Sequence, residues 1–326
     1  MALPNEIDAA DLPDFLIIGA MKAGTSSMHH LLGSHPGVFI PDGEIFFFDL
    51  DELECHHDFP VGADGEWIDR DFEKNFEEYL PWYRSFFEEA PGDALVGEDS
   101  TTYAVSKLAP ERISEVLGDV KLIHMMRHPA DRAYSHYWHL LRTGRATKTF
   151  EDRLRTAPHG FMKYGYYREN LERYLEYFDR SQLKCVVFER FVERTQTVVD
   201  EVCDHLGVDA AVDVAEAESH QNRAKIPKMR GLKRYLNDVD PTREEFRYNS
   251  HLPGGPDKSS AGPGPIRQLR RAVHGVLDDV TMIGADRSYP PMEEATRQYL
   301  TSEFKRHNRG LSSLVGRDLS EWWEDW

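Results

Sequence analysis

FLIIGAMKAGTSSMHHLLGSHP, residues 15–36, joins an apolar run to a loop with two glycines and then to a segment that opens with three hydroxyl residues. The apolar run predicts a buried strand over 15–19, and the pattern after the loop predicts a helix over 25–32. In a strand–loop–helix unit the backbone N–H groups of the loop and of the helix N-terminus converge on one anion. We therefore expect a phosphate-binding loop made of Lys22, Ala23, Gly24, Thr25, Ser26 and Ser27.

The position of the lysine distinguishes this loop from the one that binds ATP or GTP. In that loop, G-x-x-x-x-G-K-[ST], the lysine follows the second glycine. Here Gly19 and Gly24 have the right spacing, but Thr25 stands in the lysine position and Lys22 lies inside the loop. A P-loop kinase of nucleotides or metabolites also needs an acid for Mg²⁺, which Asp99 would supply. A kinase stays open as an alternative, as does a binding protein that keeps an inactive nucleotide cradle.

The composition indicates one α/β unit with an acidic surface. The 326 residues include 39 Lys and Arg against 57 Asp and Glu, which gives a formal net charge of −18. Such a surface argues against general binding of nucleic acid, so an anionic ligand needs a local basic pocket. We treat residues 1–326 as a single domain.

Cysteine usage and the N-terminal residues indicate a cytoplasmic protein. Cys55, Cys185 and Cys203 are scattered, and their spacing fits no metal site. Residues 1–14 lack the basic start and the apolar core of a signal peptide. No apolar run approaches the ~20 residues that a membrane span needs. We expect a reducing compartment and no membrane span.

Strands and helices alternate along the chain, which predicts a three-layer α/β fold with a central parallel sheet covered by helices on both faces. Further strands are expected over 94–97, 120–126 and 184–188, and helices over 71–89, 110–117, 129–142, 167–179, 191–206 and from 291 onward. Two irregular stretches, 41–94 and 237–265, interrupt this alternation. Long loops of this kind carry specificity, so we expect them to line one side of a ligand site or to form a lid.

A second anion site is expected in LIHMMRHPADRAYSHYWH, residues 122–139. An arginine at the carboxyl end of a parallel strand points into the crevice where open α/β sheets bind ligands, and Arg127 has this position. Ser135 lies within the first two turns of the helix that follows. Together Arg127 and Ser135 suit a phosphate separate from the one held by the first loop.

These two motifs resemble those of sulfotransferases that use 3′-phosphoadenosine 5′-phosphosulfate (PAPS). Residues 19–27 are similar to the family's 5′-phosphosulfate loop, and Arg127 with Ser135 to its 3′-phosphate site. GYYRENLERYLEYF (165–178), VVFERF (186–191) and LVGRDLSEWW (314–323) look like stretches of bacterial members. The resemblance implies a P-loop-like fold, PAPS as donor, 3′-phosphoadenosine 5′-phosphate (PAP) as product, and no metal requirement. Because the sulfonate sits on a single 5′-phosphate, a lysine inside the loop can reach the leaving phosphate.

The stretch DGEIFFFD, residues 42–49, resembles the Lys-Glu-Pro-His-Phe-Phe-Asp stretch of the carbohydrate branch. There the glutamate is taken to deprotonate the acceptor, which implies that Glu44 is the base and that Glu44 and Lys22 are the catalytic pair. The chain departs from this pattern at Gly43 in place of lysine, Ile45 in place of proline and Phe46 in place of histidine. The acceptor end is therefore expected to differ from that of heparan-type enzymes.

The remaining candidates lie later in the chain. A basic island at 222–232 resembles the family's late basic loop at the 3′-phosphate, which implies a role for Lys228, Arg230 and Gly231, although a solvated helix end explains it equally well. We further expect Tyr166 at the adenine or the acceptor, and Glu98, Asp99, Ser100 and Tyr103 at the acceptor. The expected partner is a hydroxyl, or an amine, of a small metabolite or a glycan.

Overall fold

The computed structural model describes residues 11–57, 59–61, 66–217, 226–239, 251–253, 275–277, 279–283, 288–323 and 326. Within them, one parallel sheet has the strand order β2 (Val38–Phe39), β3 (Leu95–Asp99), β1 (Phe15–Gly19), β4 (Lys121–Met126) and β5 (Leu183–Val187). The predicted α/β fold with a central parallel sheet is confirmed. Because all pairings are parallel, the loops that follow β1, β3 and β4 open at one edge of the sheet.

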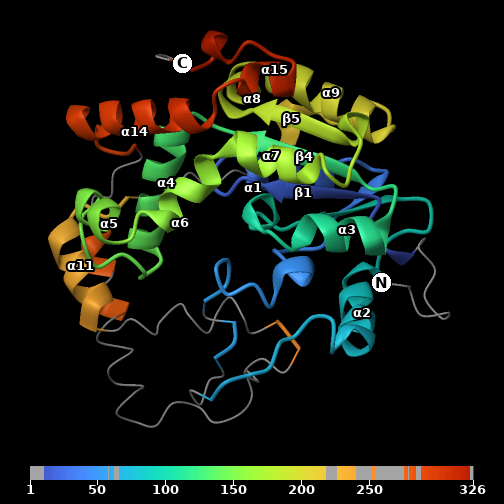
Figure 1. Ribbon diagram of the computed structural model, residues 1–326, viewed down its shortest axis with the longest axis horizontal. Helices are drawn as coiled ribbons and strands as arrows, with labels where there is room; N and C mark the ends of the chain where they lie inside the picture. The colour runs from blue at the N-terminus through green and yellow to red at the C-terminus, as the bar shows by residue number, and fades with distance from the viewer. Residues whose placement is uncertain are drawn as a thin grey trace.

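Helices lie on either side of this sheet, as Figure 1 shows. Their bounds are α1 Thr25–Gly33, α2 Phe76–Arg84, α3 Ala109–Leu117, α4 Pro129–Arg142, α5 Phe150–Thr156, α6 His159–Met162, α7 Tyr167–Tyr174, α8 Phe188–Glu193, α9 Thr195–Leu206, α10 Val214–Ala217, α11 Arg230–Val239, α14 Glu294–His307 and α15 Leu311–Val315. One buried apolar cluster surrounds the sheet, and a second joins α4 to α5, α6 and α14 beside it.

Close packing inside the sheet depends on glycine at one position. Phe15 of β1 lies opposite Gly97 of β3, and a Cβ on Gly97 would come within 2.2 Å of the Phe15 ring. A larger residue at 97 would therefore push β1 and β3 apart. This matters for the site because the loops after these two strands form two of its walls.

Several boundaries differ from those predicted. β3 continues through Glu98 to Asp99, and the expected helix over 191–206 is two helices, α8 and α9. The expected helix over 71–89 is shorter, since α2 begins at Phe76 and ends at Arg84. The aromatic residues of 41–94 explain the irregular pattern, because many of them pack on one another: the Phe47 ring stacks on Tyr83 with 4.1 Å between centroids.

The stretch expected to be irregular over 237–265 is only partly described. Residues 237–239 are the end of α11, where the Asn237 amide donates to the carbonyls of Leu141 and Ala146 at 3.0 and 2.9 Å. Residues 240–250 and 254–265 lie outside the described residues, so the expected lid stays a prediction.

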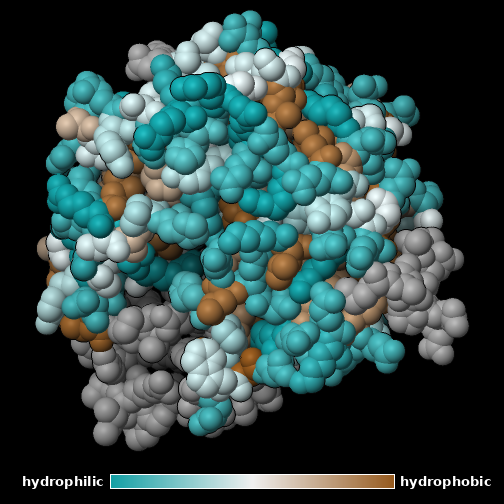
Figure 2. Space-filling view, viewed as in Figure 1, coloured by the Kyte–Doolittle hydropathy of each residue, from teal (hydrophilic) through white to brown (hydrophobic). Residues whose placement is uncertain are grey.

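The outer surface agrees with the composition. The face in Figure 2 is largely hydrophilic, and apolar residues are scattered over it. Among the described helices, none combines the length and the apolar character that crossing a membrane requires.

Candidate active site

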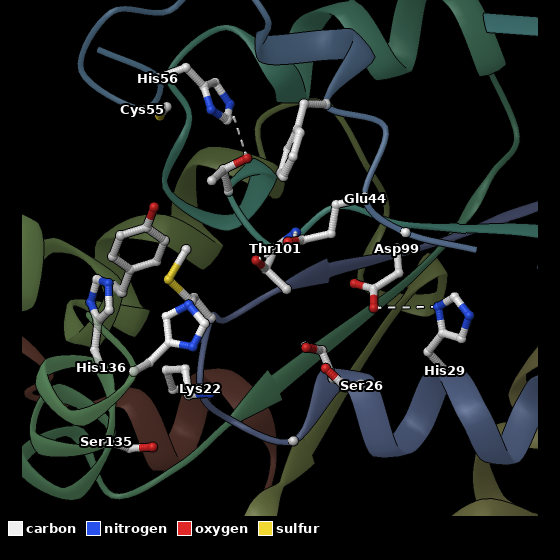
Figure 3. Close-up of a pocket in the computed structure, with 18 of the residues that line it drawn as sticks. Lys22, Ser26, His29, Glu44, Cys55, His56, Asp99, Thr101, Ser135 and His136 are labelled. Carbon is white, nitrogen blue, oxygen red and sulfur yellow. Dashed lines mark hydrogen bonds and ion pairs between the residues drawn. The ribbon is translucent and has the colours of Figure 1, made fainter. Parts of the chain in front are cut away.

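A cavity of about 1100 Å³ opens at the edge of the sheet where β1, β3 and β4 end. Its walls come from the β1–α1 loop, from residues 42–59, from the end of β3 and from α4. Figure 3 shows Lys22 and Ser135 on one side of this cavity and Glu44, Thr101 and Asp99 on the other. Of the residues predicted to act at the site, Lys22, Gly24, Thr25, Ser26, Ser27, Glu44, Arg127 and Ser135 line it.

The β1–α1 loop exposes several backbone N–H groups to the cavity. Lys22 has φ 68° and Gly24 has φ 95°, so the chain turns sharply before α1 begins at Thr25. No side chain caps this helix, and in the described part of the chain the N–H groups of Gly24, Thr25 and Ser26 meet no acceptor. Unpaired N–H groups at the start of a helix attract an anion, as the sequence predicted.

Glycine is required at position 24 for a further reason. A Cβ there would lie 2.7 Å from the Phe188 ring, in a backbone conformation that side chains other than glycine rarely adopt. Phe188 in turn supports the Arg127 guanidinium, whose central carbon lies 4.8 Å from the ring centroid. The two predicted anion sites are thus joined through one aromatic side chain.

Lys22 is a partly buried cation in a positively charged corner. Burial, followed by the nearby charges of Arg142 and Arg127, lowers its pKa to about 8, while Glu44 acts in the opposite direction. Its ammonium therefore remains mostly protonated at neutral pH. Within the described residues Lys22 forms no ion pair, and a cation held this way is suited to an anion that enters from solution.

Arg127 lies at the end of β4 with its backbone fixed. Its N–H donates to the Tyr167 hydroxyl at 3.1 Å, and that hydroxyl donates to the Arg127 carbonyl at 2.7 Å. Within the described ranges its guanidinium has no carboxylate partner. Ser135 of α4 is buried, and its hydroxyl lies 3.1 Å from that of Tyr289. Both predicted residues therefore present polar groups to the same cavity.

Glu44 is held against the end of β3. Its Oε1 accepts hydrogen bonds from the Thr101 N–H at 2.8 Å and from the Thr101 hydroxyl. Burial and the neighbouring Asp99 raise the pKa of Glu44 to about 7, against the opposing effects of Thr101 and His56. A carboxylate with such a pKa can accept a proton near neutral pH, as a general base must.

Asp99 is the other carboxylate of this wall. It is 5% exposed, and its Oδ2 lies 3.5 Å from His29 Nδ1 on α1. Burial raises its pKa, and His29 lowers it. Because Asp99 and Glu44 influence each other's protonation, the pair shares negative charge in the cavity.

Glu98, Ser100 and Tyr103, which were expected to line the acceptor pocket, lie behind its wall instead. Glu98 is fully buried and accepts hydrogen bonds from Tyr83, Ser100 and Tyr103 at 2.5, 2.6 and 2.7 Å. The Ser100 hydroxyl accepts from the N–H groups of Ile45 and Phe46 at 3.1 and 2.9 Å. These residues hold the turn that carries Glu44. Asp99, at the end of β3, and Thr101 and Thr102, in the turn that follows, reach the cavity.

The other residues that were predicted to bind the donor do not line the described cavity. Ala23 is buried, and Tyr166 stacks on His307 with 4.1 Å between ring centroids. Arg230 lies over Trp138, 5.1 Å from its centroid, at the start of α11. Lys228 and Gly231 are exposed beside it, and Lys228 N–H donates to Thr281 at 3.0 Å. Their roles at the 3′-phosphate and the adenine stay predictions.

Sequence reasoning missed a histidine near Glu44. Phe46, at φ 61°, occupies the position where the carbohydrate-branch pattern has histidine, and the His56 ring lies 4.9 Å from it. His56 Nε2 lies 2.9 Å from Asp49 and 3.3 Å from the Thr102 hydroxyl, so the imidazole reaches the cavity from a different loop. No spacing pattern links residue 56 to residue 44, because the contact exists only after folding.

Comparison with known proteins identifies the family of this chain. The sulfotransferase domain model matches residues 12–251, well over half of the sequence. The chain belongs to the sulfotransferase domain family. A solved sulfotransferase from Alicyclobacillus acidocaldarius matches with a TM-score of 0.61 and 24% identity, over 95% of this chain and 98% of the other. The expected P-loop-like sulfotransferase fold is therefore confirmed.

Curated sulfotransferases match along most of the sequence at moderate identity. The human bifunctional heparan sulfate N-deacetylase/N-sulfotransferase 2 is 28% identical over 326 residues, which cover 94% of this chain and 30% of that protein. The human heparan sulfate glucosamine 3-O-sulfotransferase 3A1 is 29% identical over 216 residues, 64% of this chain and 47% of that protein. The chain thus spans about a third of the length of the bifunctional relatives. These matches agree with the resemblance to the carbohydrate branch that the sequence shows.

Proposed function

We propose that this protein transfers a sulfonyl group from PAPS to a hydroxyl, or an amine, of a glycan or a small metabolite. The observation that carries the proposal is the pairing, across one cavity, of a lysine and free helix N–H groups with a glutamate whose pKa is about 7. A sulfonyl transferase needs this combination, since charge grows on a leaving phosphate while a proton leaves the acceptor.

The residues present fit a nucleotide that carries two separate phosphate groups. The N–H groups of Gly24, Thr25 and Ser26 together with Lys22 suit one of them, and the Arg127 guanidinium with Ser135 suits the other. PAPS, when bound, supplies a sulfonyl group activated by its 5′-phosphate. The Phe188 ring lies between the two sites, so Arg127 and the loop keep a fixed separation.

Each catalytic residue has a defined task in this proposal. Glu44 takes the proton of the acceptor hydroxyl or amine as the new bond to sulfur forms, and Thr101 keeps the carboxylate oriented. Lys22 and the helix N-terminus stabilise the negative charge that the leaving phosphate gains as its bond to sulfur breaks. Arg127 and Ser135 touch no reacting atom and set donor affinity.

The names of the relatives support a glycan as one acceptor class. Both human relatives are named as acting on heparan sulfate, one on nitrogen and one on a 3-O position. Gly43, Ile45 and Phe46 mark where this chain differs from the carbohydrate-branch pattern.

The three cysteines are free, which agrees with a reducing compartment, and we propose a cytoplasmic location on that ground.

Ligand-induced stabilisation tests the donor directly. PAP at about a hundred times its dissociation constant should stabilise the fold by ~2.7 kcal/mol, which a thermal melt detects, whereas adenosine 5′-monophosphate should stabilise it less. Mass spectrometry of the acceptor after incubation with PAPS then measures transfer. Stabilisation by ATP with Mg²⁺ and not by PAP would instead support a kinase, and PAP binding without turnover of any acceptor would support an inactive nucleotide-binding protein.

A further inference from the structure

A tryptophan near the C-terminal end of the chain lies behind the donor side of the site. Residues 311–323, drawn in red in Figure 1, return to α8, where Trp323 meets the first turn of that helix. Trp323 is 1% exposed and belongs to the apolar cluster around the sheet. Its side chain does not line the described cavity, and it lies outside residues 12–251, which match the family model.

One carboxylate connects the indole of Trp323 to the end of β4. Trp323 Nε1 donates to Glu189 Oε2 at 2.8 Å, and Glu189 Oε1 accepts from the His128 N–H at 2.9 Å. This N–H belongs to the peptide that joins Arg127 to His128. Each oxygen of the Glu189 carboxylate thus has one donor, so the indole fixes the carboxylate and the carboxylate fixes the peptide.

The same indole packs on the residue that holds the other side of this peptide. The Tyr167 hydroxyl donates to the Arg127 carbonyl at 2.7 Å, and the Tyr167 and Trp323 rings lie 6.0 Å apart between centroids. The His128 ring meets Trp323 edge-on at 6.2 Å. Both polar groups of the peptide between residues 127 and 128 therefore bind side chains that contact Trp323.

The first turn of α8 also supports the guanidinium of Arg127. Phe188 directly precedes Glu189, and its ring lies 4.8 Å from the central guanidinium carbon. An arginine stem has several rotatable bonds, so a fixed backbone and a ring against its head reduce the entropy that binding must remove. Side chains that keep this support in place therefore raise the affinity of Arg127 for an anion.

Resting on the proposed function, we infer that Trp323 is a positioning residue that strengthens binding of the donor's 3′-phosphate by Arg127. Through Glu189 and Tyr167 it fixes the peptide behind the guanidinium, and it touches neither the donor nor the acceptor. Its contribution is therefore confined to nucleotides that carry a 3′-phosphate. Loss of core packing alone would lower the melting temperature without this selectivity.

Calorimetry with PAP and with adenosine 5′-monophosphate tests this inference, after a thermal melt has established that the unchanged protein binds PAP. Trp323→Phe keeps an aromatic ring but removes the donor to Glu189, so PAP affinity should fall about threefold to tenfold, as for one lost hydrogen bond. Affinity for adenosine 5′-monophosphate should change less than about twofold. Trp322→Phe, whose ring lies against Arg194, is the matched control and should change neither affinity.

Glu189→Asp is a second variant, and it keeps the test available should Trp323→Phe not fold. The shorter side chain keeps the charge but cannot reach both of its donors, so the same selective loss of PAP affinity is expected. Glu193→Asp, an exposed acid at the end of α8, is the matched control and should leave both affinities unchanged.

Combining Trp323→Phe with Arg127→Ala separates positioning from packing. If Trp323 acts through Arg127, its substitution should cost no further PAP affinity once the guanidinium is absent. Equal losses for the two nucleotides, unchanged PAP affinity in Trp323→Phe and Glu189→Asp, or a full further loss in the combined variant would each overturn the inference. Failure of the unchanged protein to bind PAP counts against the proposed function instead, so the first melt tells the two failures apart.

Discussion

Residues 19–27 and residues 42–59 line the same cavity but are built in different ways. The first segment is a single turn between β1 and α1, and its anion-binding groups are backbone N–H groups with one lysine. The second contributes Glu44 only because Thr101, Ser100 and Asp99 from β3 and its loop lie against it. One side of the site is local in sequence, and the other is an assembly of distant segments.

This difference determines which substitutions each side of the cavity tolerates. The donor side depends on backbone conformation at Lys22 and Gly24 and on helix polarity, which few substitutions preserve. The acceptor side depends on side-chain packing and charge, which can change one residue at a time. We therefore expect donor chemistry to be shared with relatives and acceptor preference to be particular to this chain.

The largest effect is expected for the acceptor side. Glu44→Gln keeps the shape and the hydrogen bonds from Thr101 but removes the base, so kcat should fall ~10²–10⁴-fold while PAP affinity is kept. Steady-state kinetics with PAPS and calorimetry with PAP measure the two quantities.

Glu98→Gln is the matched control for that variant. Glu98 is fully buried behind the wall of the cavity, and its side chain does not line the described cavity. Its loss should lower the melting temperature and leave most of kcat intact. A fall in kcat as large as that of Glu44→Gln would show that turnover depends on the buried support of this turn as much as on Glu44 itself.

The next effect is expected for the donor side. Lys22→Ala removes the cation that we propose stabilises the leaving phosphate, so kcat should fall ~10²–10³-fold, with a smaller loss of PAP affinity. Lys107→Ala, an exposed lysine paired with Glu54, is the control and should change neither. If Lys22→Ala weakened PAP binding in proportion to kcat, Lys22 would bind the donor and add nothing in the transition state.

The donor side and the sheet could be predicted from sequence because their signals are local. The strand at Phe15–Gly19, the helix that follows the loop and the helix over Pro129–Arg142 have the predicted positions. Arg127 and Ser135 were placed by the same logic, since a strand end and the next helix start are neighbours in both sequence and space.

The acceptor side could be predicted only in part, for a physical reason. Glu44 was found through a resembling stretch, but the alternation of side chains at the end of β3 sends Asp99 into the cavity and Glu98 behind it. The sequence pattern predicted a strand that ends at Gly97, whereas β3 continues to Asp99, so the alternation of side chains was not extended to Glu98 and Asp99. His56 and His29 reach their carboxylates through tertiary packing, which no spacing reveals.

A third prediction separates affinity from turnover on the donor side. Arg127→Ala removes a guanidinium that has no acidic partner in the described part of the chain, so PAP affinity should fall ~10–100-fold, as for a lost hydrogen bond to a charged group. Affinity for adenosine 5′-monophosphate, which lacks the second phosphate, should change little. Calorimetry with both nucleotides measures the contrast, with the exposed Arg155→Ala as control. Equal losses for both nucleotides would place Arg127 away from the 3′-phosphate.

The smallest effect concerns the pH dependence of the acceptor side. Glu44 must be deprotonated to act as a base, and its pKa is about 7, so kcat/KM should fall as the pH drops through 7, by about tenfold per unit well below it. Asp99→Asn removes the neighbouring negative charge that raises this pKa, so the falling limb should move to lower pH. Thr101→Val removes a hydroxyl that stabilises the carboxylate, so the limb should move to higher pH. Opposite shifts in the two variants are expected only if Glu44 itself titrates in the rate profile, whereas shifts in one direction, or none, would assign that limb to another group.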